Sequence, residues 1–257
     1  MNHTPYSQYD NEEHPPVPPA GPVRIFRRPT SEPPYVTYFM IATCVLAFLG
    51  QLFTQTTTGA DLLAALGAKV NPLIVAGQYW RLITPMWLHG SVLHIAFNMY
   101  ALFIFGSNLE RYYGHNRFLL LYLISGFAGN VISFMMTPRP SLGSSTAIFG
   151  LLAAQAVFLY QNRTLIQNAR SLLMSTLMIA GINLLLGTSP GIDNWGHLGG
   201  LIGGLAFAWS AGPIWTVQAD FTGVSLVNQR SRRRVALVAV GVTLVFAALA
   251  ALRIWMG

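Results

Sequence analysis

Seven apolar segments, separated by polar or mixed stretches, dominate the pattern along this chain. They cover residues 35–53, 92–109, 118–136, 145–160, 171–186, 196–211 and 235–256. A helix crosses a bilayer with about 20 residues, and about 17 at the low end, so the fourth to sixth segments need neighbouring helices to cover their polar ends. Backbone groups in hydrocarbon must bond within their own segment, which makes helix the expected state. The pattern therefore predicts an all-α membrane protein with seven crossings.

The composition agrees with this pattern. Of the 257 residues, 53% are hydrophobic and only 9% are charged, and the mean hydropathy is +0.48, whereas soluble domains carry about 25% charged residues. The single cysteine, Cys44, lies within an apolar segment, so we expect a buried, inert thiol and no intrachain disulfide. The net charge of +7 is concentrated beside apolar segments, and no nucleic-acid-binding motif is present. We therefore expect a lipid bilayer, and no nucleic acid, as a partner.

The positive charges give the expected orientation. With a cytoplasmic N-terminus, eleven of the fifteen Lys and Arg residues fall on the inner side and four on the outer side. The positive-inside rule chooses this arrangement, which leaves the C-terminus outside. The inner residues are Arg24, Arg27, Arg28, Arg111, Arg117, Arg163, Arg170, Arg230, Arg232, Arg233 and Arg234, and the outer ones are Lys69, Arg81, Arg139 and Arg253. Because no organelle-targeting presequence is evident, we expect an integral, multi-pass protein of a bacterial plasma membrane.

Four regions follow one another along the chain. Residues 1–34 contain nine prolines and are expected to form a disordered, proline-rich cytoplasmic tail, with a docking site for a partner as the alternative. Residues 35–212 form the expected six-helix core. Residues 213–234 form a basic cytoplasmic linker, and residues 235–257 form the seventh transmembrane helix.

The connection between the first two apolar segments, at 54–91, is long and fairly apolar. Its apolar stretches are too short to span a bilayer and too hydrophobic to lie in water, so we expect them at the membrane interface. Trp80 and Trp87 fit an interfacial aromatic belt.

Three polar side chains lie near the outer ends of apolar segments. His94, Ser145 and His197 stand near the starts of the second, fourth and sixth segments, and alternating crossings bring these starts to the same side of the membrane. Polar groups are costly in a bilayer, so three of them at one depth form a functional hypothesis. A serine beside a histidine predicts a nucleophile and its base. Asn98 shares a helical face with His94 at spacing i, i+4, and both side chains can donate hydrogen bonds.

Each of these residues also has a purely structural interpretation. Ser145 can be a helix cap, and His94 and Asn98 can join two helices through hydrogen bonds. His197 can be a satisfied polar group. Asp193, four residues before it, is expected to cap a helix rather than to assist the imidazole. The joint pattern of a serine, a histidine and a donor pair on three helices is what favours a catalytic site.

The sixth segment carries two ladders of glycine, one at positions 196, 200 and 204 and one at 199 and 203. Such ladders let helix backbones approach closely, and simple packing explains them. Gly150 and Ala154 offer the fourth segment a matching small face. This packing gains a purpose if it brings His197 against the helix that begins at Ser145.

Two other kinds of site are weakly supported. A proton-coupled transporter would use the histidines as a relay, but the apolar interior lacks carboxylates. A metal site built on His89 and His94 is disfavoured because spacing i, i+5 directs the two side chains to different faces of a helix, and no cysteine or acid completes a ligand set. We therefore expect neither a metal nor a cofactor.

Several short motifs follow one another along the chain. These are Trp80-Arg81, then His89 with His94-x-x-x-Asn98, then Gly106-x-x-x-Glu110, then Gly143-x-Ser145 leading into Ala147-Ile148-Phe149-Gly150, and finally His197-x-x-Gly200-x-x-x-Gly204. In this order and spacing, the chain resembles the rhomboid family of intramembrane serine proteases over residues 36–212.

The resemblance implies a rhomboid-like catalytic six-helix bundle plus a C-terminal seventh transmembrane helix. Ser145 would be the nucleophile and His197 the general base of a Ser–His dyad, with His94, Asn98 and the Ser145 backbone N–H as oxyanion-hole donors. The implied activity is hydrolysis of peptide bonds in or near transmembrane segments of single-pass or other membrane proteins. The alternative is a catalytically inactive relative that binds transmembrane helices.

The chain departs from the family's motif at one position. The residue after the serine is usually glycine, and here it is Thr146. A β-branched residue is stiffer and bulkier than glycine. We expect it to tighten the approach of the fourth and sixth segments or to alter the oxyanion geometry, and it is the only support for the inactive alternative.

Overall fold

A computed structural model describes residues 32–189, 191–220 and 223–256 of the chain. Its helices are α1 (Tyr35–Thr58), α2 (Leu62–Gly67), α3 (Asn71–Val75), α4 (Val92–Ala101), α5 (Ser107–Tyr113), α6 (His115–Met136), α7 (Ser145–Gln161), α8 (Ala169–Leu186), α9 (Asn194–Ala211) and α10 (Arg232–Trp255), and its strands are β1 (Trp215–Asp220) and β2 (Gly223–Asn228). Each expected apolar segment coincides with a helix, which confirms the all-α membrane class. The expected N-terminal tail lies, up to residue 31, outside the described residues.

Five helical runs among the described residues are long and apolar enough to cross a membrane. They are α1, α6, α8, α10 and the run Val92–Tyr113, in which a π-helical turn at Leu102–Gly106 joins α4 to α5. Helix α7 has only 17 residues. Helix α9 has 18 residues but includes five glycines and His197. The fold is that of a multi-pass membrane protein, and the expected count of seven crossings stays a prediction.

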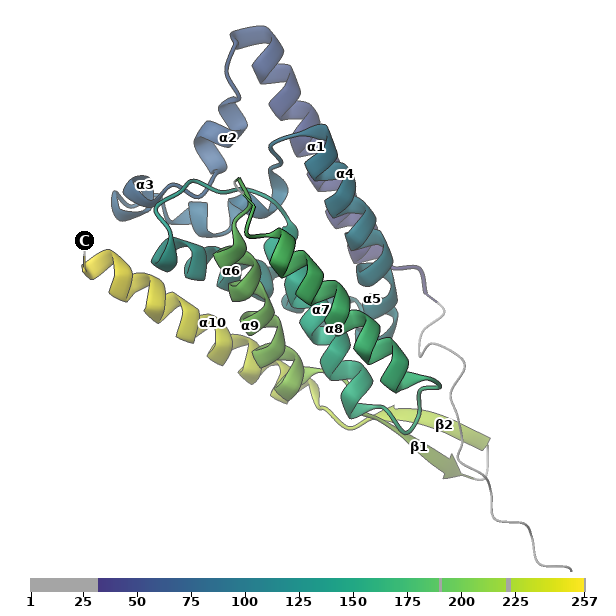
Figure 1. Ribbon diagram of the computed structural model, residues 1–257. Coiled ribbons are helices and arrows are strands. Elements are labelled where there is room, and N and C mark those ends of the chain that lie inside the picture. Colours follow the sequence, from purple (N-terminus) through teal and green to yellow (C-terminus); the bar gives the residue numbers. More distant parts are fainter. Residues whose placement is uncertain (1–31, 190, 221–222, 257) are drawn as a thin grey trace, which may run out of the picture.

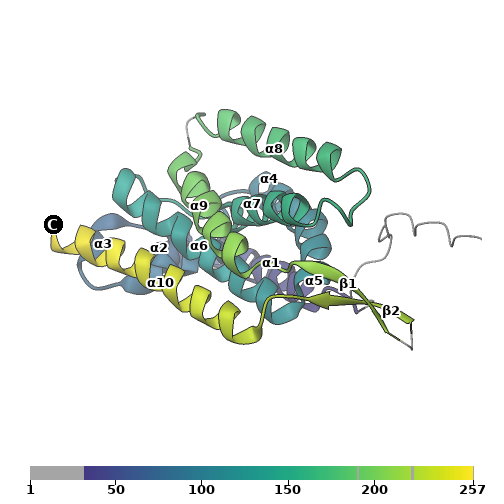
Figure 2. The same ribbon diagram turned by 90° about the horizontal axis from the view of Figure 1, so that it is seen from below.

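Helices α6, α7 and α9 form the centre of the bundle, and α8 and α10 pack against them from outside. Helix α9 packs against both α6 and α7, while α8 lies along α7 on one side and α10 lies along α6 and α9 on the other (Figures 1 and 2). In the apolar stretch of α6, 67% of the residues are buried, against 17% in α8 and 22% in α10. The outer helices expose large apolar side chains, such as Leu185 and Leu237. A surface of this kind suits contact with lipid tails.

The two glycine ladders of α9 face two different helices. A Cβ atom at Gly200 would meet the carbonyl of Thr146, and one at Gly204 would meet the backbone of Gly150, both on α7. A Cβ atom at Gly199 would lie 2.9 Å from the carbonyl oxygen of Ala128, on α6. The absence of these side chains allows backbone-to-backbone contact on both sides of α9.

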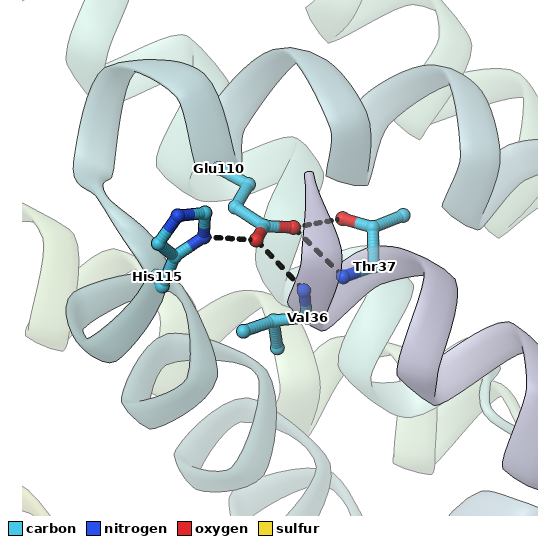
Figure 3. Close-up of polar contacts among 4 residues, drawn as sticks. All are labelled: Val36, Thr37, Glu110 and His115. Carbon is cyan, nitrogen blue, oxygen red and sulfur yellow. Dashed lines mark hydrogen bonds and ion pairs between the residues drawn. The ribbon is translucent and has the colours of Figure 1, made fainter. Parts of the chain in front are cut away.

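A buried carboxylate joins the first helix to α5. Glu110 is fully buried and accepts hydrogen bonds from the backbone N–H groups of Val36 (2.8 Å) and Thr37 (2.7 Å), which belong to the first turn of α1. The Thr37 hydroxyl donates at 2.6 Å, and His115 Nδ1 lies at 2.6 Å (Figure 3). A negative group at a helix N-terminus satisfies free N–H groups and complements the helix dipole. Four contacts therefore hold this acid at the end of the bundle opposite Ser145.

The long connection expected at the membrane interface forms short helices. It contains α2, α3 and two 3₁₀ turns, Tyr79–Leu82 and Thr84–Trp87. Arg81 is buried and donates to the carbonyls of Ala68 (2.8 Å) and Ala65 (2.7 Å), while the half-exposed Trp80 donates to the carbonyl of Leu66 at 3.0 Å. Trp80 and Arg81 thus join the second half of this connection to the carbonyls at and just after α2.

The region expected as a basic linker contains an antiparallel hairpin. Strands β1 and β2 pair from Trp215↔Asn228 to Asp220↔Gly223, with residues 221–222 outside the described residues. The hairpin projects from the end of the bundle where α9 ends and α10 begins (Figure 1). Sequence patterning did not anticipate it, because isolated two-stranded hairpins bury little surface and leave a weak signal.

We predict that Gly200→Ala separates α7 from α9. The added methyl group would collide with the backbone carbonyl of Thr146, so we expect a loss of at least about 2 kcal/mol in the free energy of unfolding. Thermal melting in detergent measures this loss. The matched control is Gly241→Ala, because a Cβ atom there meets nothing within 4 Å and alanine favours helix. Equal melting temperatures for the two variants would contradict the prediction.

Candidate active site

The hydroxyl of Ser145 and the imidazole of His197 meet between α7 and α9. Ser145 Oγ lies 2.9 Å from His197 Nε2. Ser145 is the first residue of α7, and the N-cap position belongs to Ser144, whose side chain makes no capping hydrogen bond. The Ser145 hydroxyl is therefore directed at the imidazole rather than used as a helix cap. For the hydroxyl to donate, Nε2 must be unprotonated, which leaves the ring proton on Nδ1.

An aromatic ring fixes the plane of the imidazole. The rings of His197 and Phe149 stack with centroids 4.2 Å apart and planes 13° apart. Phe149 lies one turn after Ser145, so a single helix presents both the hydroxyl and the ring that orients its partner. His197 is 8% exposed, and its Nδ1 has no hydrogen-bond partner among the described residues. In a Ser-His-Asp triad, a hydrogen bond to the acid orients the histidine. Here, packing against Phe149 orients the His197 ring instead.

Asp193 has the structural role expected from its position. Its Oδ1 accepts a hydrogen bond from the Gly196 N–H at 3.0 Å and so caps α9. Its Oδ2 accepts a short hydrogen bond from the Ser133 hydroxyl of α6. The carboxylate thus fixes the turn of α9 that carries His197 without bonding to the imidazole.

Gly143 brings His94 close to the Ser145 hydroxyl. Gly143 has φ = +138°, and a Cβ atom there would lie 2.8 Å from His94 Nε2 and 3.5 Å from Ser145 Oγ. Only glycine accommodates both this backbone conformation and this crowding. The Gly90 N–H donates to His94 Nδ1 at 3.4 Å, so the proton belongs on Nε2, the nitrogen that faces the site.

Asn98 lies one turn beyond His94 on α4. It is 8% exposed, and its Nδ2 is a buried donor with no acceptor among the described residues. An unused buried donor is costly in a finished core. The amide is therefore free to bond to a group that enters the site.

Thr146 packs against glycines of α6 and α9. Its Cγ2 would lie 3.0 Å from a Cβ atom at Gly196 and 2.9 Å from one at Gly129, so its methyl group fills the space between α9 and α6. Of the two expected effects of Thr146, this packing matches the tight approach of α7 and α9. The glycine at position 129 supplies the room that the larger side chain needs.

His89 supports the loop before Ser145. Its Nε2 lies 3.2 Å from the Ser144 hydroxyl, and Gln51 of α1 bonds to both its N–H (3.0 Å) and its C=O (3.1 Å). Helix α4 begins only at Val92, so His89 precedes the helix and does not point away from His94. Instead, the two rings meet edge to face at 5.2 Å. No group of three His, Cys, Asp or Glu residues within the described part of the chain could hold a metal ion.

Lys69 is a fully buried cation, and the sequence, which placed it only among the outer basic residues, did not indicate its structural role. Its backbone pairs with Ser141, with N···O distances of 2.9 and 3.1 Å, and its Nζ donates to the carbonyl of Thr137 at 3.1 Å. Burial lowers the pKa of Lys69 to about 8, while the Asp193 charge opposes that change. Lys69 thereby ties the loop that leads to Ser145 onto the end of α6. A single lysine inside an apolar run was the available signal.

We predict that His89 makes the protein sensitive to mild acid. Burial, with a smaller contribution from the His94 charge, lowers the pKa of His89 to about 4, against an opposing hydrogen bond to the Trp87 backbone. The unfolded chain, with a histidine pKa near 6.5, binds more protons between these values, so stability falls as pH falls from 6.5 towards 4. The expected loss from this group is about 2 kcal/mol at pH 5.

Melting curves of the wild type and of His89→Gln at pH 7.5 and pH 5 test this prediction. Glutamine keeps an amide near Ser144 but does not titrate. The variant is expected to lose less stability on acidification than the wild type. Parallel losses in both proteins would show that His89 does not contribute.

The chain matches a family model and several known proteins. A family model described as Rhomboid domain matches residues 76–214. The chain is 43% identical over 180 residues to rhomboid protease GluP of Bacillus subtilis (strain 168), an alignment covering 70% of this chain and 35% of that protein. It is 37% identical over 150 residues to RHOMBOID-like protein 9, chloroplastic, of Arabidopsis thaliana, covering 58% of this chain and 35% of that protein.

A second plant protein, RHOMBOID-like protein 6, mitochondrial, of Arabidopsis thaliana, is 40% identical over 152 residues, covering 58% of this chain and 50% of that protein. The matched region thus spans about a third to a half of the length of these relatives. The family-model match, residues 76–214, includes every residue of the candidate site from His89 to His197.

Proposed function

Because this chain belongs to the rhomboid family, we propose that it is an intramembrane serine endopeptidase. It would hydrolyse peptide bonds in or near transmembrane segments of other membrane proteins. The observation that carries this proposal is the 2.9 Å contact between Ser145 Oγ and His197 Nε2, a nucleophile and a base within hydrogen-bond reach. The protease name of a relative 43% identical to this chain adds support.

Both chemical steps, formation of the acyl group on Ser145 and its hydrolysis, use the dyad. As Ser145 Oγ attacks the carbonyl carbon of the scissile bond, His197 Nε2 takes the hydroxyl proton. The proton then passes to the departing amide nitrogen as the C–N bond breaks, which leaves an acyl group on Ser145. A water molecule attacks this ester, with His197 again as the base, and releases the acid and free Ser145. The stacked ring of Phe149 keeps the imidazole in one plane through both transfers.

The negative oxygen of the tetrahedral intermediate needs donors. The first N–H groups of α7, including that of Ser145, have no partner within the helix and lie at its positive end. His94 Nε2 and Asn98 Nδ2 would supply two side-chain donors, and the unsatisfied state of the Asn98 amide supports this role. One such donor is worth about 2.7–4 kcal/mol of transition-state stabilisation.

The substrates that suit this site are transmembrane helices with a weak outer end. A helix must unwind before its carbonyl reaches Ser145, so small or helix-breaking residues favour cleavage. Hydrolysis needs water at this depth, which requires a cavity open to the outer side. Eleven of fifteen basic residues on the opposite side support a cytoplasmic N-terminus. A bacterial plasma membrane is the setting that we propose.

We predict that Ser145→Ala and His197→Ala each abolish cleavage of a model transmembrane substrate in proteoliposomes. The first removes the nucleophile and the second removes the base, while the surrounding packing tolerates a smaller side chain. The exposed Ser171, on α8, gives the control Ser171→Ala, which should cleave like the wild type. Full cleavage by purified Ser145→Ala would refute the proposal.

A fluorophosphonate probe separates the protease from an inactive, helix-binding relative. The probe reacts with an activated serine, so it should label the wild type and not Ser145→Ala. Absence of labelling in wild-type protein with a normal melting curve would favour the binding function.

We predict that His94→Ala and Asn98→Ala slow catalysis without preventing substrate binding. Loss of one oxyanion donor should lower kcat about 100- to 1,000-fold with little change in KM. Phe97, on the same helix but 66% exposed, gives the control Phe97→Ala with near-normal kcat. A wild-type kcat in either donor variant would remove that residue from the proposed oxyanion hole.

A further inference from the structure

Three arginines converge at the end of the bundle opposite the dyad. Arg230 donates to the carbonyls of Ser210 (2.9 Å) and Trp209 (3.3 Å) at the end of α9, and Arg234 donates to the same Ser210 carbonyl at 2.9 Å. Arg117, near the start of α6, donates to the Arg230 carbonyl at 3.3 Å. The guanidinium groups of three different segments therefore meet where α6, α9 and α10 come together.

The positive charge in this cluster exceeds what the described residues neutralise. Arg232 and Arg233, both exposed, stand beside Arg234 in the first turn of α10, which contains no acidic residue. Cations are unfavourable at a helix N-terminus. The only ion pair found among the described residues joins Glu110 to His115. No carboxylate described in the structure therefore pairs with these arginines.

Two guanidinium N–H groups at this junction are left without acceptors. Arg117 Nη1 and Arg230 Nε are buried and have no hydrogen-bond partner among the described residues. Burial and the Arg234 charge lower the pKa of Arg230. The carbonyls at the end of α9 account for part of the donor capacity of the cluster and leave the rest unused. An acceptor with several oxygens would complete it.

The cluster lies at the depth of lipid headgroups. Trp209, whose carbonyl Arg230 contacts, is 52% exposed, and its ring stacks with that of the 47% exposed Tyr160 at 6.0 Å. Exposed tryptophan and tyrosine rings mark the interface between hydrocarbon and water. An acceptor that reaches the arginines at this depth comes most directly from the bilayer itself.

We propose that the junction of Arg117, Arg230 and Arg234 binds the phosphate of an anionic phospholipid. The guanidinium groups bond to the phosphate oxygens, and the acyl chains lie along the apolar surface of α10. The bound lipid joins α10 to α6 and α9 at the side that the positive-inside rule makes cytoplasmic. This site is independent of proteolysis by the dyad.

General attraction between basic residues and an anionic bilayer is the simpler alternative. The binding free energy from such attraction depends on the number of basic residues near the surface, at about 1 kcal/mol for each, and not on which arginine carries the charge. A built site depends on the arginines that contact the α6–α9 junction. Two pairs of arginines in one short stretch separate these cases. Arg230 and Arg234 both donate to the Ser210 carbonyl at the junction, whereas Arg232 and Arg233, which are as exposed as Arg234, stand beside them in the first turn of α10.

The test compares Arg230→Gln/Arg234→Gln with Arg232→Gln/Arg233→Gln, which remove the same charge. Full-length protein is titrated with phosphatidylglycerol in detergent micelles and, separately, with phosphatidylcholine and inorganic phosphate. Native mass spectrometry counts retained lipids, and thermal melting reports stabilisation. We expect phosphatidylglycerol to remain bound to the wild type and to the second variant. The first variant should bind it about thirtyfold more weakly.

Equal weakening in both double variants would reduce the site to general attraction and overturn the proposal. Equal stabilisation by millimolar inorganic phosphate would replace the lipid with a soluble anion. If the first variant does not fold, Arg230→Lys/Arg234→Lys keeps both charges but lacks the guanidinium fork. Weakened phosphatidylglycerol binding in that variant supports the site, and unchanged binding refutes it.

Discussion

Close contact between helix backbones is the constraint on which the rest of this structure depends. Gly200 and Gly204 let α9 approach α7 until main-chain atoms touch, Gly199 does the same against α6, and Gly203 makes room for the Ala128 methyl group of α6. The hydrophobic effect gives no preference for helix contact over lipid contact, so such packing has to supply the association. The distance between the hydroxyl of α7 and the imidazole of α9 follows from this approach. A side chain in the ladder would move one reactive group away from the other.

Much of the fold was readable from the sequence because a bilayer limits the choices. Apolar runs of sufficient length must become helices in hydrocarbon, and the helices coincide with those runs. The residues at which the helices end were less predictable. The second helix continues to Tyr113 through a π turn rather than ending near 109, and polar residues at helix ends carry no length signal. The hairpin of Trp215–Asp220 and Gly223–Asn228 was missed because it is not one of the apolar runs to which that constraint applies.

The sequence likewise indicated some residues of the candidate site and not the roles of others. Ser145 and His197 were identifiable because a polar side chain in an apolar segment is costly and needs a reason. The supporting roles of the residues around them were not. Lys69 and His89 lie in the long connection, where polar side chains are ordinary, and their contacts with Ser141 and Ser144 join segments far apart in the chain. Sequence spacing describes one helix face well and says little about loops that fold back on it.

Thr146 illustrates how a departure from a family motif is absorbed by its surroundings. The side chain points between α6 and α9, where Gly129 and Gly196 leave room for its methyl group. A glycine at 146 would leave that space empty, and a larger residue at 129 would meet both Thr146 and the carbonyl of Gly196. The two positions therefore constrain each other through volume. It follows that a motif position next to a candidate nucleophile can change in size where a neighbouring helix offers matching space.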